Sequence, residues 1–188
     1  MRHPFMETLS AALAEAKIAT LRYQFPYMER GQRRPDPPAT LVAAGRAAVA
    51  EAHRLAPDLP LLAGGKSLGG RITSQAAAAG DSAEAYRVVR GLVFFGFPLH
   101  AAGRPSVSRA AHLNDVAQPL LFLQGTRDAL ADLSLIRSVC AALGERATLH
   151  VVDGADHGFA VLKRSGRTAD QVFGELAQSV RHWVDRLS

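Results

Sequence analysis

The chain has a single cysteine, no long apolar run and no clustered positive charge, and each shortage excludes a class of protein. Cys140 cannot form an internal disulfide because the chain offers it no second thiol. No stretch reaches the roughly 18 apolar residues that cross a bilayer, and residues 1–4 lack the layout of a signal peptide. We therefore expect a cytoplasmic protein with no membrane association.

The net charge of +5 raises the question of nucleic-acid binding. Almost all the basic residues are arginines, and they are scattered along the chain between acidic residues. The pair Arg33-Arg34 falls in a proline-rich loop, and no aromatic residues alternate with a basic stripe. We interpret the excess charge as a solvated, arginine-rich surface, so no nucleic-acid partner is expected.

The 188 residues, 48% of them apolar and 21% charged, are typical of one soluble domain with a substantial core. Apolar runs typical of strands alternate with segments of helical periodicity. This alternation predicts a mostly parallel sheet between two helical layers, a three-layer α/β/α sandwich over residues 1–188. Strands are expected at 18–25, 61–65, 88–95, 119–124 and 147–152, and helices at 5–16, 40–55, 68–79, 131–143 and 168–187; residues 80–82 interrupt the regular structure.

One of these strands, an apolar run that we expect to be buried, ends in the pattern Gly65-Lys66-Ser67-Leu68-Gly69, and an alanine-rich helix is expected to follow. Such a turn lifts the serine hydroxyl clear of the sheet in a strained conformation. We expect Gly65 and Gly69 to pass too close for side chains, and the Leu68 N–H to face any oxyanion formed at the serine. The alternative is a glycine-rich turn whose serine only caps the helix.

Gly-Lys-Ser also ends the phosphate-binding loop, Gly-x4-Gly-Lys-Ser/Thr. That loop would need a glycine at position 60, where this chain has Pro60. The sequence therefore favours the nucleophile turn over a nucleotide site.

A serine needs an imidazole base and a carboxylate that orients it. In a parallel sheet these come from loops at the carboxyl ends of strands. Asp128 follows the strand at 119–124, and His157 follows the strand at 147–152. The order Ser67, Asp128, His157 is that of α/β-hydrolase triads.

Together, Gly65 to Arg71, Leu123 to Asp128 and Gly154 to His157 resemble the α/β-hydrolase superfamily, and more narrowly its small dienelactone-hydrolase-like branch. The resemblance covers essentially the whole chain. Dienelactone hydrolase itself uses a cysteine nucleophile, so Ser67 implies the esterase-like version. No metal or cofactor is implied, since the histidines show no ligand spacing.

The resemblance also implies a strand and a His-Gly-rich loop just before the segment at 2–6, with the strand beside the nucleophile strand and the loop providing a second oxyanion N–H. The printed sequence begins after that point. Either the true start lies upstream, or the sheet is completed in some other way, and the sequence does not decide between these. For residues 1–188 we expect an α/β-hydrolase fold with reduced N-terminal strands, and no residue is assigned as the second donor.

Other residues compete for each role. Asp132 is expected to begin a helix, Asp153 to form a turn, and Asp156 adjoins His157, a position from which side chains rarely meet. His100 ends a strand, whereas core or solvated roles are expected for the histidines elsewhere. Lys66 is interpreted as a packed or salt-bridged side chain and Cys140 as a small core residue. The competing histidines are His53, His112, His150 and His182.

Lidded members of the superfamily usually insert the lid after the strand at 88–95, where residues 96–118 leave room for one short helix. We therefore expect an open site suited to small or short-acyl carboxylic esters, cleaved through an acyl-enzyme. The alternative is a non-catalytic binding or scaffold protein that keeps the fold. The sequence does not indicate the oligomeric state. Candidate substrate-binding residues are Tyr27, Met28, Phe97, His100 and Phe159.

Overall fold

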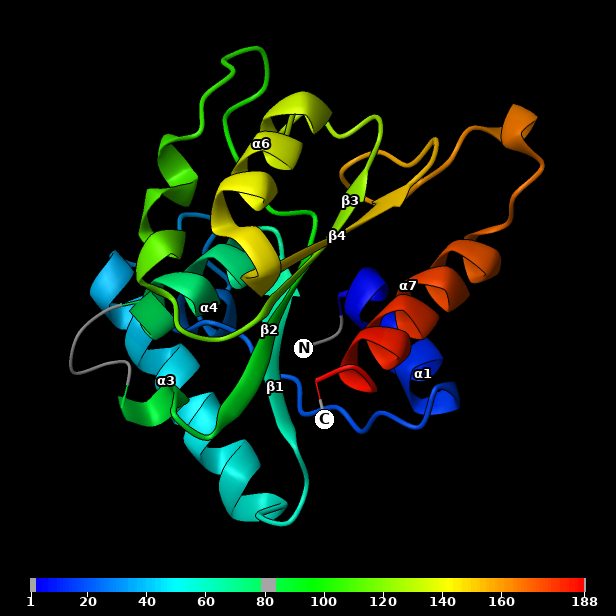
Figure 1. The fold of residues 1–188 in the computed structure, drawn as a ribbon. Helices are drawn as coiled ribbons and strands as arrows, with labels where there is room; N and C mark the ends of the chain where they lie inside the picture. The colour runs from blue at the N-terminus through cyan, green and yellow to red at the C-terminus, as the bar shows by residue number, and fades with distance from the viewer. Residues whose placement is uncertain (1–2, 79–83, 188) are drawn as a thin grey trace.

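A computed structural model describes residues 3–78 and 84–187. Its centre is a sheet of four parallel strands in the order β1-β2-β3-β4, which runs through the middle of the molecule (Figure 1). All four carboxyl ends therefore meet at one edge of the sheet. The strands are β1 (Leu61–Lys66), β2 (Val89–Phe95), β3 (Leu120–Gly125) and β4 (Ala147–Val152).

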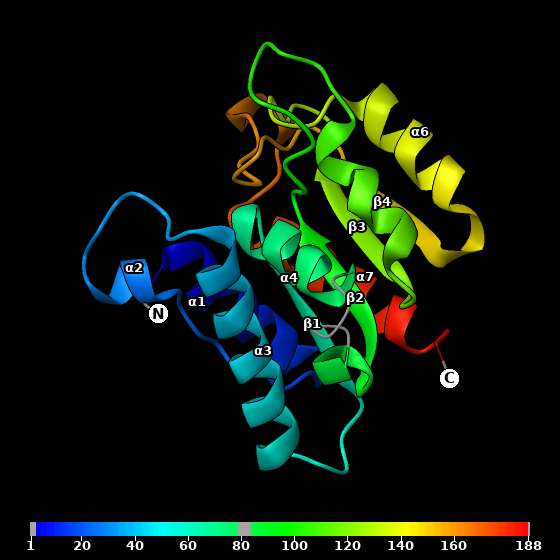
Figure 2. The same ribbon diagram turned by 90° about the vertical axis from the view of Figure 1, so that its left-hand side faces the viewer.

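Helices cover both faces of the sheet. Helices α1 (Pro4–Glu15) and α7 (Ala169–Val184) lie side by side on one face. Figure 2 shows the other face, with α3 (Pro38–Leu55) and α4 (Leu68–Ala78) over β1 and β2, and α6 (Leu133–Leu143) at the β3–β4 side. The remaining elements are the one-turn helix α2 (Pro26–Glu29) and the 3₁₀ segments η1 (Glu84–Tyr86), η2 (Ser108–Asp115), η3 (Gly144–Arg146) and η4 (Lys163–Ser165).

The two central strands are buried on both faces except at Arg90 of β2, as their almost entirely apolar sequences predict. Successive side chains point to opposite faces of a strand. On β3, Leu120 and Phe122 accordingly join the core under α3, α4 and α6. Leu121 and Leu123 join the core under α1 and α7. The three-layer sandwich expected from the sequence is therefore confirmed.

The strand β1 is an edge strand, bonded to β2 alone in the sheet, and it is mostly half-buried rather than buried. Our expectation of a buried nucleophile strand was wrong in this respect. A groove of about 720 Å³ lies along its free side. It is lined mainly by apolar residues of α1, α3, α7 and the segment 17–23.

The strand expected at 18–25 was also wrong: these residues form no strand. A strand needs a neighbour for its backbone hydrogen bonds. Here the groove separates β1 from this segment, whose residues 18–23 line the far side. Phe25 is nevertheless buried, packing with Leu41 and Ile72. The apolar pattern was therefore correct about burial at Phe25 alone, since Leu21 is exposed and Ile18 and Tyr23 are half-buried, and it was wrong about pairing.

The remaining elements follow the sequence closely, within a few residues at their ends. Between β2 and β3, the connection holds η2 but no lid. Pro26, expected to end a strand, begins α2, and the interruption expected at 80–82 lies outside the described residues. No helix in the described ranges has the length and apolar character needed to cross a membrane.

Candidate active site

The serine sits at the turn between β1 and α4 in the strained conformation expected, with a φ of 52°. Its N–H donates to the Phe95 carbonyl at 3.2 Å, which ties the turn to β2. Helix α4 then begins at Leu68, and the first N–H groups of a helix have no partner within it. The Leu68 N–H therefore has no partner within the helix.

The close approach that requires glycine involves Gly65 and Gly70. A Cβ on Gly65 would lie 2.8 Å from the Gly69 carbonyl carbon, and one on Gly70 would lie 2.8 Å from the Gly65 oxygen. A Cβ on Gly69 would meet nothing within 4 Å. Our expectation that Gly69 excludes a side chain was wrong, because the helix turns the next residue toward the strand.

The carboxylate of Asp128 follows β3 and is fully buried. One oxygen, Oδ1, accepts from the Leu130 N–H at 2.8 Å. The other, Oδ2, accepts from the Gln124 side-chain amide and lies 2.7 Å from Nδ1 of His157. Gln124 is itself fixed, since its Oε1 accepts from the Phe97 N–H at 3.0 Å. The hydrogen bonds that a buried carboxylate needs are thus present.

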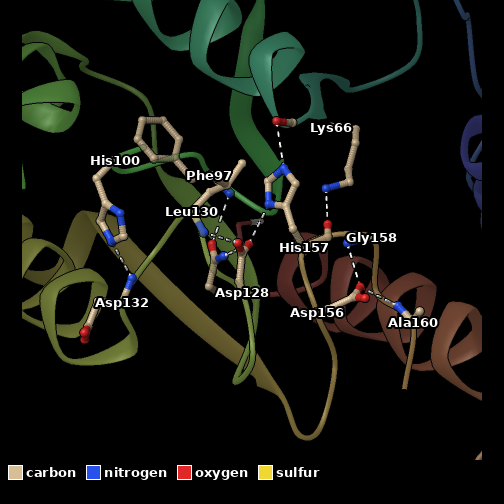
Figure 3. Close-up of polar contacts among 12 residues, drawn as sticks. Lys66, Phe97, His100, Asp128, Leu130, Asp132, Asp156, His157, Gly158 and Ala160 are labelled. Atoms are coloured by element: carbon tan, nitrogen blue, oxygen red, sulfur yellow. Dashed lines mark hydrogen bonds and ion pairs between the residues drawn. The ribbon is translucent and has the colours of Figure 1, made fainter. Parts of the chain in front are cut away.

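His157 completes the arrangement (Figure 3). Its Nδ1 faces a carboxylate, which can only accept, so Nδ1 carries the proton and donates. Its Nε2 then has a free lone pair, and it lies 2.8 Å from Oγ of Ser67. The three residues expected from the sequence are therefore joined in one hydrogen-bonded chain, the geometry needed to take a proton from the serine.

The turn that carries His157 is held by the neighbouring acid. Asp156 Oδ1 accepts from the N–H groups of Gly158 and Ala160, at 2.8 and 2.9 Å. The Arg127 N–H donates to the Ala155 carbonyl at 2.9 Å, which links this turn to the one bearing Asp128. Asp156 thus shapes the turn, and the geometry gives the contact with the imidazole to Asp128.

Lys66, which precedes the serine, points toward the same turn. Its ammonium donates to the His157 carbonyl. It also lies 5.5 Å from the ring centre of Phe5 and 5.4 Å from that of Phe159. Burial lowers the pKa of Lys66 from its ordinary 10.5 to about 8, although the charges of Asp128 and Asp156 act to raise it.

The other candidate residues are distributed differently. Phe97, His100 and Phe159 are buried, whereas Tyr27 is half-buried and Met28 is exposed. His100 has a structural environment: Nε2 accepts from the Asp132 N–H and Nδ1–H donates to the Ala101 carbonyl, both at 2.9 Å. Asp132 caps α6, as expected, and Cys140 is buried.

A second serine–histidine pair joins α4 to η2. Ser74 Oγ lies 2.8 Å from Nε2 of His112 and donates to the Arg71 carbonyl at 2.9 Å. Ser74 is fully buried in mid-helix, where no substrate reaches its hydroxyl. The pKa of His112 is lowered by burial and by the charge of Arg71. We interpret this pair as a packing contact.

The sequence analysis missed two features of the site: the role of Gln124 as a partner of Asp128, and the contact of Lys66 with the His157 carbonyl. Gln124 is a polar residue near the end of an otherwise apolar strand, and it is completely buried. A buried amide requires partners, so its position four residues before Asp128 was a usable signal. The contact between Lys66 and the His157 carbonyl spans 91 residues, and no local pattern indicates it.

The family comparison agrees with this geometry. A family model described as "Alpha/beta hydrolase domain" matches residues 1–185. The chain belongs to this family.

Solved structures similar to this α/β hydrolase include serine hydrolases and an esterase. An α/β serine hydrolase homologue from Coxiella burnetii gives a TM-score of 0.71 at 21% identity, covering 97% of this chain and 76% of that one. A Xanthomonas campestris α/β serine hydrolase without a lid gives 0.70 at 24%, covering 97% and 75%. The esterase domain of a Rhodothermus marinus protein gives 0.63 at 17%, covering 98% and 81%. At these identities, the likeness establishes the fold.

A matched pair of substitutions tests the packing of the nucleophile turn. Gly70→Ala should lower the free energy of unfolding by about 1–3 kcal/mol, because its Cβ meets backbone. Gly69→Ala should change it by no more than about 1 kcal/mol, because the site is open and alanine favours a helix. Urea unfolding of both proteins measures the difference. Equal midpoints for the two variants would contradict this description of the turn.

The environment of Lys66 predicts an unusual titration. Its amine should titrate near pH 8, as read by NMR of ¹³C-methylated lysines and assigned by the signal lost in Lys66→Arg. The folded pKa lies below the unfolded one, so between about pH 8 and 10.5 the unfolded chain binds more protons at this group. Lys66 should therefore add to stability as pH rises through that window. A midpoint near the ordinary lysine pKa would show that the amine is solvated.

Proposed function

We propose that this α/β hydrolase is a serine hydrolase that cleaves small or short-acyl carboxylic esters. The observation that carries the proposal is the hydrogen-bonded chain from Asp128 Oδ2 through the His157 imidazole to Ser67 Oγ, with links of 2.7 and 2.8 Å. Ser67 stands at a strained turn, and such strain persists where function requires it.

In the proposed reaction, Ser67 Oγ attacks the ester carbonyl while His157 Nε2 takes the hydroxyl proton. Asp128 holds the imidazole in the required tautomer and stabilises its charged form. The Leu68 N–H donates to the oxyanion of the tetrahedral intermediate. His157 then protonates the departing alcohol, and the acyl-enzyme is hydrolysed by water, which His157 activates in turn.

The absence of a lid in the connection from β2 to β3 supports a small, accessible substrate. Among the residues expected at the acyl group, Tyr27 and Met28 keep solvent-accessible surface. Tyr27 packs in the same cluster as Leu68, whose N–H is the assigned donor. We include Tyr27, Met28, Phe97, His100 and Phe159 in the proposal as the surroundings of the acyl group, together with a dienelactone-hydrolase-like specificity and a cytoplasmic location.

The open edge of β1 favours a second candidate, a binding protein that keeps the hydrolase fold. Only Leu68 is assigned as an oxyanion donor, and loss of one donor from such a site costs about 100- to 1000-fold in rate. A binding protein has no need, however, for a serine, a histidine and a buried carboxylate in hydrogen-bonded sequence. The hydrolase proposal accounts for all three.

Labelling with a fluorophosphonate probe tests the nucleophile directly. The parent protein should form a covalent adduct on Ser67, located by peptide mass mapping. His157→Ala should reduce the labelling rate by at least about 1000-fold, because the serine loses its base. Asp128→Asn should also reduce the labelling rate strongly, because the asparagine amide can donate to Nδ1 and so favour the tautomer of His157 that cannot accept the serine proton.

Two controls make this result specific. Ser67→Ala should abolish the adduct and also hydrolysis of p-nitrophenyl acetate and butyrate. Ser74→Ala should leave labelling unchanged, because that serine is buried in α4. A folded parent protein that gains no adduct on Ser67 would favour the binding protein.

A further inference from the structure

The ammonium of Lys66 occupies an unusual position for a charged group. It lies over two neighbouring rings, those of Phe5 on α1 and Phe159 on the turn after β4, whose centres are 5.9 Å apart. The ammonium donates a hydrogen bond to the backbone carbonyl of His157. A Cβ built on Gly96 would lie 3.0 Å from Lys66 Nζ and 3.4 Å from the His157 ring, so both groups crowd the same backbone. Lys66 therefore contacts the backbone of His157, whereas Asp128 contacts its imidazole ring, and Figure 3 shows the two residues on different sides of His157.

Placing the ammonium here does not stabilise the fold as burial of an apolar side chain would. An ammonium that leaves water loses solvation, which neighbouring rings and a carbonyl replace only in part. The lowered pKa of Lys66 has burial as its main cause and reflects this loss. A methionine could lie against the same two rings without a charge, but it could not donate a hydrogen bond to the His157 carbonyl, as the ammonium does.

We propose that Lys66 is a positioning residue for the base of the proposed hydrolase: its ammonium holds the His157 carbonyl and so fixes the imidazole between Asp128 and Ser67. Lys66 adjoins Ser67 in sequence, so one peptide unit links the nucleophile to the anchor of its base. Other hydrogen bonds hold the turn at 153–159 on both sides of His157, at Asp153, Gly154 and Ala155 before it and at Gly158 and Ala160 after it. Lys66 is the contact at His157 itself. This inference rests on the function proposed above.

The test compares Lys66→Met with the parent by the rate of fluorophosphonate labelling at pH 7. We expect the variant to label about 10- to 100-fold more slowly, the loss typical of a reacting group displaced by a fraction of an ångström to one ångström. We also expect it to melt at the same temperature or higher, because a desolvated charge has been removed. Lys163→Met, the same change at an exposed lysine on η4, should match the parent in both measurements.

The pH dependence separates positioning from space filling. The groups around Lys66 are Asp128 on the turn after β3, and Asp156 and His157 on the turn after β4; α1 contributes the ring of Phe5. All of these are present in both proteins, so the ratio of parent to Lys66→Met rates reports Lys66. This ratio should fall toward one as pH rises from 7 to 10, since the amine loses its proton near pH 8. A ratio that stays constant would overturn the proposal.

If Lys66→Met does not fold, Lys66→Arg decides the matter, since its guanidinium stays charged throughout this range. Its rate relative to the parent should rise above pH 8, and a flat ratio would overturn the proposal. A parent protein that gains no adduct on Ser67 refutes the proposed function and this inference with it. A labelled parent whose rate Lys66→Met leaves unchanged refutes the inference alone.

Discussion

The constraint on which the candidate site depends is the need to satisfy a fully buried carboxylate. Asp128 is removed from water, and an isolated buried charge is far too costly to persist. Its three partners come from its own turn, from the end of β3 and from the turn after β4: the Leu130 N–H, the Gln124 amide and the His157 imidazole. Gln124 in turn binds the Phe97 N–H beyond β2. One carboxylate thus joins the ends of three strands, and His157 takes its orientation from that network.

Stability and function favour different residues around this network. The serine has a positive φ, and the half-buried ammonium of Lys66 has lost part of its hydration, which lowers its pKa. Both features reduce the stability of the fold, and both meet at the same turn. The two apolar cores, one on each face of the sheet, supply stability that offsets this loss. Strain and desolvation concentrated at one end of β1 are therefore physical support for a functional site there.

Much of this arrangement was readable from the sequence because it depends on local patterns. The buried strands β2 and β3 are continuous apolar runs, and Ser67, Asp128 and His157 each follow a strand whose end could be located. Parallel pairing then requires those ends to meet. The predictions that were wrong concern features that depend on neighbours distant in the sequence. The segment 18–25 has a strand-like pattern but no neighbour, and Gly70 rather than Gly69 faces the strand because of the direction in which α4 leaves the turn. No sequence window contains the contact from Lys66 to the His157 carbonyl.

The contacts around Ser67 matter to its geometry because β1 lies at the edge of the sheet. The Ser67 N–H points toward β2, so alternation along the strand turns the backbone groups of Lys66 and Gly64 to the other side, where the groove lies. A strand with one neighbour has half the lateral support of a central strand. The serine is therefore held on one side by its bond to Phe95 of β2 and from below by the close approach of Gly65 to Gly70 at the start of α4. On an edge strand the packing of α4 against β1 thus contributes to the geometry of the nucleophile, and Lys66 links the same strand to the turn that carries His157.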